Sequence, residues 1–225
     1  MIIAIDGPSG AGKSTLGKML AKNLCLLYLD TGAMYRAVGL AVLQNAVSFT
    51  DKTRIAEIAA AAKIELVGEP ESLQTFLDGA DVSAEIRTNE VGQAASIVSA
   101  VSEVRKILVD HQREIGRNAA LGCVLDGRDI GTVVFPQADA KFFLTAKPEA
   151  RARRRFEEDS AKGHASTYEQ TLAEINQRDE RDVSRDDSPL KIADDAVVID
   201  TSELDLREVY EQMMTFVRAK QNETA

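Results

Sequence analysis

One short segment constrains the fold of this chain more than any other feature: Gly7-Pro8-Ser9-Gly10-Ala11-Gly12-Lys13-Ser14. It matches the pattern G-x-x-x-x-G-K-[ST] and lies between a short apolar run at residues 2–6 and a helical pattern at residues 13–23. Glycines in such a loop let successive backbone N–H groups turn inward around phosphate oxygens, and the start of a helix adds partial positive charge. A glycine-rich turn without a ligand is the alternative. The strand, the lysine and the helix together favour a phosphate-binding loop.

The residues of this loop have distinct expected roles. We expect Lys13 to reach the β- and γ-phosphates of a nucleotide such as ATP, and the Ser14 hydroxyl to ligate Mg²⁺. Thr15 is expected to support the side of the α-phosphate. The predicted nucleotide contacts are Gly7, Pro8, Ser9, Gly10, Ala11, Gly12, Lys13, Ser14 and Thr15.

Short apolar runs alternate with helical patterns along the chain. They predict five buried strands, at residues 2–6, 26–29, 121–125, 141–144 and 196–199. Buried strands that alternate with helices are typical of an α/β protein with a doubly wound parallel sheet. Turn residues within 63–82 predict a small antiparallel β insert in the form of a hairpin, and the charged helical stretch 147–187 predicts a lid. We therefore expect one domain over residues 1–225, with its core at 1–62, 83–146 and 188–225.

Composition limits the function classes. The 225 residues suffice for one α/β core, and 44% hydrophobic and 28% charged residues are ordinary for a globular protein. No apolar run approaches the ~20 residues that cross a bilayer, and residues 1–5 lack the features of a signal peptide, so we expect a cytoplasmic protein. The net charge of −9 argues against a nucleic-acid partner. A monomer is the default expectation. Cys25 and Cys123 lie among apolar residues, which predicts reduced, packed side chains.

In an acidic chain, clustered arginines are informative. Arg151, Arg154 and Arg155 fall on one helical face, and Arg178, Arg181, Asp182 and Arg185 share another. Because acidic residues are interspersed, two salt-bridged solvated helices are the alternative. With a phosphate site already predicted, a lid that closes over an anionic ligand is the preferred interpretation.

Two predicted strands end in distinctive polar segments, which favours a second anion site. Residues 30–36 follow the second strand and include Arg36, and residues 126–132 follow the third and include Arg128. Ligands of doubly wound sheets gather at the carboxyl ends of strands. Asp126 resembles the acid that holds Mg²⁺ in P-loop proteins. The alternatives are a solvated Arg36 and a purely structural carboxylate at Asp126.

Four segments together resemble the bacterial cytidylate kinases: residues 6–15, 29–36, 126–136 and 178–185. The resemblance runs from end to end of the chain and includes the β insert of the longer bacterial form. It implies that the insert at residues 63–82 binds the nucleoside monophosphate and covers the acceptor. The sequence Asp126-Gly127-Arg128-Asp129-Ile130-Gly131-Thr132 is much more specific to that family than the phosphate-binding loop. It implies a P-loop nucleoside monophosphate kinase that transfers the γ-phosphoryl group of ATP to CMP, and to dCMP, with Mg²⁺.

The resemblance also implies residue roles. The acceptor phosphate would be held by Thr31, Arg36, Arg128 and Arg185. The cytosine would be read by Ser96, Arg105 and Asp129, while the ribose would face Arg178 and Asp182 and the site would be oriented by Asp30. The metal would be bound by Ser14 and Asp126. The catalytic residues would be Lys13, Arg128, Arg151, Arg155, Arg181 and Arg185. Many members have Ser where this chain has Thr31, so the hydroxyl is kept. Many also have Gly where this chain has Ser14, which leaves open how far the family depends on a hydroxyl ligand for the metal.

Rival functions differ in the acceptor or in the class of protein. A related kinase could use AMP, UMP, shikimate or a sugar acid as its acceptor. A nucleotide-dependent switch is the rival from another class, but the guanine-reading Asn-Lys-x-Asp segment is missing. Because a phosphate monoester has a second pKa of about 6, the acceptor oxygen would already be ionised and would need no general base.

Overall fold

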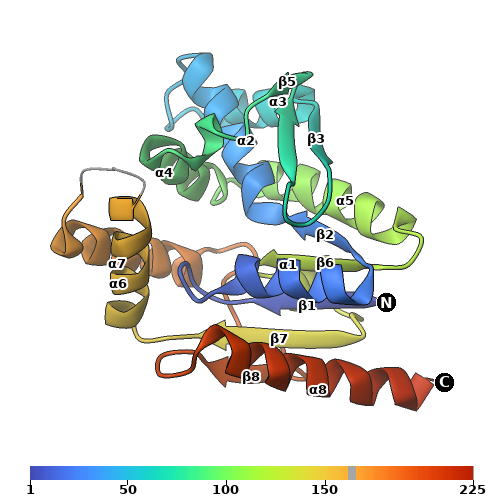
Figure 1. Cartoon of the computed structure of the whole chain (residues 1–225). Coiled ribbons are helices and arrows are strands. Elements are labelled where there is room, and N and C mark those ends of the chain that lie inside the picture. The colour runs from blue at the N-terminus through green and yellow to red at the C-terminus, as the bar shows by residue number, and fades with distance from the viewer. Residues whose placement is uncertain (162–165, 225) are drawn as a thin grey trace.

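A five-stranded parallel sheet in the order β2-β6-β1-β7-β8 forms the centre of the molecule (Figure 1). The computed structural model describes residues 1–161 and 166–224, so residues 162–165 of the expected lid lie outside the described residues. The strands are β1 (Ile2–Asp6), β2 (Leu27–Asp30), β6 (Cys123–Gly127), β7 (Ala140–Thr145) and β8 (Val197–Asp200). Every neighbouring pair is parallel. The predicted doubly wound sheet is confirmed.

Helices cover both faces of this sheet, because alternate side chains of each strand point in opposite directions. Ile3 and Ile5 of β1 pack in one buried cluster, to which α1 (Lys13–Leu24) and α8 (Leu206–Thr224) contribute. Ala4, between them, belongs to the cluster on the opposite face. The helices that contribute to that second cluster are α2 (Thr31–Gln44), α3 (Lys52–Ala61), α4 (Asn89–Val98) and α5 (Ser102–Asn118).

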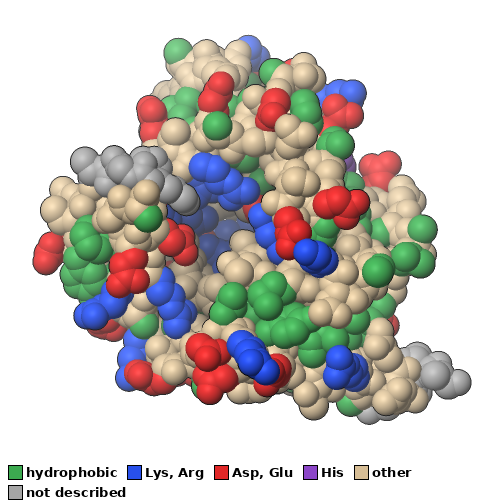
Figure 2. All heavy atoms as spheres, in the orientation of Figure 1, with side chains coloured by type: hydrophobic (Ala, Val, Ile, Leu, Met, Phe, Trp, Pro, Cys, Tyr) green, Lys and Arg blue, Asp and Glu red, His purple; other side chains and the backbone are tan. Residues whose placement is uncertain are grey.

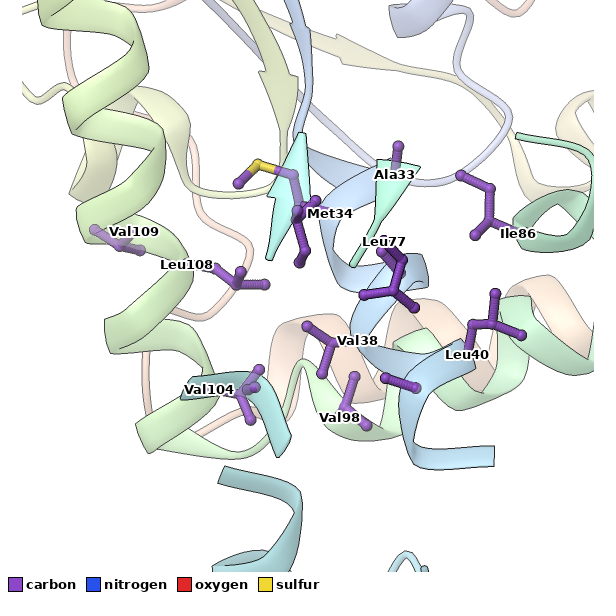
Figure 3. Close-up of a cluster of buried hydrophobic side chains, with 14 of the residues drawn as sticks. Ala33, Met34, Val38, Leu40, Leu77, Ile86, Val98, Val104, Leu108 and Val109 are labelled. Carbon is purple, nitrogen blue, oxygen red and sulfur yellow. The ribbon is translucent and has the colours of Figure 1, made fainter. Parts of the chain in front are cut away.

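The predicted β insert is a three-stranded antiparallel sheet rather than a single hairpin. Its strands are β3 (Ile64–Val67), β4 (Gln74–Leu77) and β5 (Ala80–Asp81), followed by the short helix η1 (Glu85–Arg87). The additional strand forms because the chain turns at Asp78 and Gly79, both with positive φ, and pairs again with β4. Figure 3 shows Leu77 of this sheet in the same buried cluster as Val38 of α2 and Ile86.

Two charged helices, α6 (Pro148–Ala161) and α7 (Tyr168–Ser184), pack together at the carboxyl ends of the strands (Figure 1). A capping box between Thr167 and Gln170 begins α7. A π-helical turn, η2 (Ile130–Val134), connects β6 to β7. None of the described helices is long and apolar enough to cross a membrane.

The two cysteines differ in their surroundings. Cys123 is buried in β6 as expected, but the prediction that Cys25 packs inside is wrong, because Cys25 is exposed. It follows the last residue of α1 with a φ of 56°, and this left-handed conformation ends the helix at the surface.

We expect Leu108→Ala to lower the free energy of unfolding by about 2–5 kcal/mol, because truncation of a fully buried leucine leaves a cavity. Leu108 of α5 is 1% exposed in the cluster of Figure 3. The control is Leu121→Ala, at a leucine that is 67% exposed. Urea unfolding measures both, and equal losses would contradict the assignment of this core.

Candidate active site

A cleft of about 660 Å³ lies at the carboxyl ends of the sheet strands. Its walls come from the phosphate-binding loop, from the ends of β2 and β6, and from the lid helices α6 and α7. Figure 2 shows Lys and Arg side chains gathered in the hollow between the lid and the part of the molecule that carries the β insert. The two predicted anion sites therefore open into the same cleft.

Glycines shape the phosphate-binding loop. Gly7 has a φ of 144°. A Cβ there would lie 2.0 Å from the backbone oxygen of Leu144, so no other residue fits. Gly12 has a φ of 88° and caps α1 without a side-chain hydrogen bond. The first N–H groups of α1 are therefore left without a side-chain cap, and they face a site lined by Ser9 through Thr15.

Lys13 is buried at the base of the cleft, and its Nζ donates a hydrogen bond to the backbone oxygen of Pro8 at 2.7 Å. Burial, together with the nearby Arg128, holds the pKa of the Lys13 ammonium well below its usual value. A negatively charged phosphate beside this ammonium would relieve both effects.

Ser14 and Asp126 form a pair of oxygen ligands beside the loop. The Ser14 hydroxyl donates to Oδ2 of Asp126 at 2.6 Å, and the Tyr28 hydroxyl donates to Oδ1 at 3.2 Å. Burial, with the neighbouring Asp30, raises the pKa of Asp126 to about 6. Among the described residues there is no group of three His, Cys, Asp or Glu that could hold a metal ion. A hydroxyl and one carboxylate fit Mg²⁺, which takes most of its other ligands from water and substrate phosphates.

Several arginines line the cleft, among them Arg36 of α2, Arg128 after β6, Arg178 of α7 and Arg185 at the end of that helix. Burial and Arg128 lower the pKa of Arg178 to about 9, and burial and Arg87 lower the pKa of Arg36 to about 10. The Nε atoms of Arg178 and Arg185 are buried and have no hydrogen-bond partner. Crowded cations with unsatisfied donors indicate a site built for an anionic ligand.

Carboxylates hold some of these cations in place. Arg128 donates through Nε to Oδ2 of Asp182 at 2.7 Å. Arg87, which the sequence analysis did not identify, pairs with Asp30 at 2.9 Å.

A buried ion pair joins Arg105 of α5 to Asp129, which follows β6, and both residues line the cleft. Arg105 also donates to the backbone oxygen of Ser99 at 3.2 Å. Ser99 lines the cleft, whereas Ser96 does not. The Ser96 hydroxyl instead accepts a hydrogen bond from Arg181 at 3.0 Å. The structure therefore brings together only two of the three residues expected to read the cytosine.

The predicted lid arginines do not all face the cleft. Arg155 lines it, and so does Arg154, which shares the same helical face. Arg151 is buried elsewhere and donates to the backbone oxygens of Ala146 and Ser9 and to the carboxylate of Asp179. Arg181 contacts Ser96, as described above. Both guanidiniums donate to protein acceptors. Arg151 lies where α6 packs against the phosphate-binding loop, and Arg181 lies where α7 packs against α4.

Two further expectations are modified by the geometry. Thr31 lines the cleft, but its hydroxyl donates its single proton to the backbone oxygen of Asp126 at 2.6 Å. The β insert at residues 63–82 contributes none of the described residues that line the cleft. The wall on that side is formed by Arg36, Arg87, Ala95, Ser99 and Arg105.

A family model described as Cytidylate kinase matches residues 3–219 of this sequence. The chain belongs to the cytidylate kinase family. A protein named cytidylate kinase from Caldanaerobacter subterraneus subsp. tengcongensis is 52% identical over 218 residues, which cover 96% of this chain and 94% of the relative. Another of that name, from Desulforamulus reducens, is 50% identical over 216 residues and covers 96% of both chains. The expected family is confirmed.

A solved structure shows the same fold with little sequence likeness. It is a crystal structure of an uncharacterized protein from Eubacterium ventriosum, and its TM-score is 0.51 at 13% identity. The match covers 97% of this chain and 98% of that protein. This chain therefore shares its architecture with a protein of very different sequence.

We expect Arg178→Gln to raise the thermal unfolding midpoint of the ligand-free enzyme by a few degrees, corresponding to roughly 1 kcal/mol, because it removes one of several mutually repelling buried charges. The same variant should lose most of the stabilisation that CMP gives the enzyme. Differential scanning fluorimetry measures both effects. Arg153→Gln, at an exposed arginine of α6 outside the cleft, is the matched control. A lower midpoint for Arg178→Gln would contradict the repulsion.

Proposed function

We propose that this member of the cytidylate kinase family performs its reaction in the arginine-lined cleft, between ATP on the phosphate-binding loop and CMP or dCMP on the opposite wall. The products are ADP and CDP or dCDP. The observation that carries the proposal is the convergence of Lys13, Arg36, Arg128, Arg178 and Arg185 on one cleft. Two phosphorylated ligands that meet end to end need this concentration of positive charge.

On the donor side, the residues from Gly7 to Thr15 hold the phosphates of ATP. Lys13 leaves the carbonyl of Pro8 and binds oxygens of the β- and γ-phosphates. Ser14 and Asp126 would hold Mg²⁺, which would supply positive charge to offset that of the phosphates. Arg155, which lines the cleft from α6, supports the γ-phosphate when the lid helices close.

On the acceptor side, Arg36, Arg128 and Arg185 bind the phosphate of CMP. The Arg105–Asp129 pair reads the base, because a carboxylate accepts from the cytosine amino group and a guanidinium donates to its O2 and N3. Arg178 and Asp182 face the ribose, and Asp30 keeps Arg87 at the edge of this wall.

Charge neutralisation, rather than proton abstraction, is the main task of this site. The acceptor phosphate has a second pKa of about 6, so it is largely a dianion at neutral pH. No histidine is among the described residues that line the cleft. The arginines and Lys13 instead overcome the repulsion between two polyanions and hold the reacting atoms in line.

The same proposal covers the moving parts and the setting of the enzyme. The lid at 147–187 closes over both ligands and excludes water, which would otherwise hydrolyse ATP. The acceptor-binding unit includes the insert at 63–82 and extends to Arg105, because the residues after the insert, from Arg87 to Arg105, form the wall of the cleft. We place the enzyme in the cytoplasm as a monomer without a nucleic-acid partner, in keeping with its net charge of −9.

We expect Lys13→Ala to lower the turnover of CMP by roughly 10³-fold, because one of the charges that stabilise the transferring phosphoryl group is lost. ADP release, measured with ATP, Mg²⁺ and a panel of CMP, dCMP, UMP, AMP and shikimate, gives the rate and the acceptor preference together. CMP and dCMP should react fastest.

The control is Lys22→Ala, at an exposed lysine of the same helix that pairs with Glu71. Its turnover should match that of the unaltered enzyme. A preference for another acceptor, or near-normal turnover of Lys13→Ala with CMP, would contradict the proposed function.

A further inference from the structure

We propose that Asp6 is a positioning residue that fastens the base-reading turn after β6 to the start of the phosphate-binding loop and thereby sets discrimination between acceptor bases. This inference rests on the proposed function. Asp6 is not among the residues that line the cleft, so it acts through other residues rather than by touching a substrate.

The side chain of Asp6 joins two functional loops. Asp6 is the last residue of β1 and directly precedes Gly7 of the phosphate-binding loop. Its Oδ1 accepts a hydrogen bond from the backbone N–H of Ile130 at 2.8 Å, and its Oδ2 accepts one from Gly131 at 2.7 Å. Ile130 and Gly131 directly follow Arg128 and Asp129, which line the acceptor wall. One carboxylate therefore connects the donor loop to the acceptor turn.

The turn depends on this carboxylate for its backbone hydrogen bonds. Ile130 and Gly131 begin η2, and the residue before them, Asp129, makes no side-chain cap. The Asp129 side chain is instead paired with Arg105. Asp6 thus supplies, from another strand, the two acceptors that the first N–H groups of the turn require. Because Asp6 caps this turn, the Asp129 side chain does not have to do so and can face the acceptor base.

Close packing around Asp6 leaves its contact with the turn little room to shift. Asp6 is 4% exposed, and although burial raises its pKa to about 6, both of its oxygens accept backbone hydrogen bonds, which favour the carboxylate form. An added Cβ on Gly131 would lie 3.3 Å from Oδ2 of Asp6 and 3.1 Å from Cδ of Lys141, which shows how closely the turn sits on β1 and β7. Packed interiors transmit small displacements, so a shift of Ile130 and Gly131 moves Asp129 relative to the base.

Replacement of Asp6 by Asn tests the role of the two acceptors. Asn has nearly the same shape but only one acceptor oxygen, and its amide would face one of the two N–H groups. A purely structural role would lower stability and leave the preference among acceptors unchanged. A positioning role alters the preference as well.

The experiment compares kcat and KM for CMP and UMP, and KM for ATP, in the unaltered enzyme and in Asp6→Asn. We expect the ratio of kcat/KM for CMP to that for UMP to fall by at least ~10-fold, mainly through KM for CMP, while KM for ATP changes less than ~3-fold. The matched control is Asp139→Asn. Asp139 accepts the backbone N–H of Ile2 at 2.6 Å, at the opposite end of β1, and its variant should keep the selectivity of the unaltered enzyme.

Gly131→Ala provides a second route if Asp6→Asn does not fold. The added methyl group presses the same turn away from β1 while Asp6 stays intact, and we expect a similar loss of selectivity. Folded variants that keep the preference for CMP would overturn the role of Asp6 while leaving the proposed function in place. An unaltered enzyme that forms no CDP would contradict both.

Discussion

The gathering of several cations in one poorly hydrated cleft is the constraint on which the rest of this structure depends, because burial and the neighbouring cations both disfavour their charge. Arg36, Arg128, Arg178 and Arg185 approach one another around Lys13 at the end of the sheet. The depressed pKa values of Lys13, Arg36 and Arg178 show that the folded chain disfavours this charge in the absence of a ligand. A site that binds a polyanion tightly is therefore a strained site when empty, and the rest of the fold must supply the stability.

The sheet and a set of carboxylates supply that stability. The chain runs from β1 to β2 on one side and later crosses from β6 to β7, so the order of the strands reverses beside β1 and opens a crevice at their carboxyl ends. Asp129 pairs with Arg105, and Asp182 pairs with both Arg128 and Arg185. Asp6 holds the backbone between the two loops. These acids fix the directions of the cations, so that the ligand meets groups that are already oriented.

The strands and the loop could be predicted from sequence because their signals are local. The apolar runs of β1 and β7 and the glycine pattern before Lys13 each specify a conformation within a few residues. The directions of the lid arginines could not be predicted in this way. Helical spacing places Arg151 and Arg155 on one face, but only the packing of α6 decides that Arg151 meets Ser9 while Arg155 meets the cleft.

Other contacts depend on segments that are distant in the sequence. Asp6 and Gly131 are 125 positions apart, and Arg87 and Asp30 are 57 apart, so no local pattern marks either pair. Spacing also could not show that the β insert lies outside the cleft lining, because its place is set by the packing of Leu77 and Val38 in a shared core. The family resemblance pointed to Asp129 and Asp182 as well as to the arginines that they pair with, but it gave no role to Asp6 or Arg87.

The central claim is that one cleft holds two nucleotides with their phosphates facing each other. Calorimetric titration with adenosine and cytidine joined 5′ to 5′ through a pentaphosphate tests it most directly. The linked ligand should bind at least ~100-fold more tightly than CMP alone, because one molecule would occupy both phosphate sites at once. An affinity no greater than that of the tighter single nucleotide, ATP or CMP, would contradict the account.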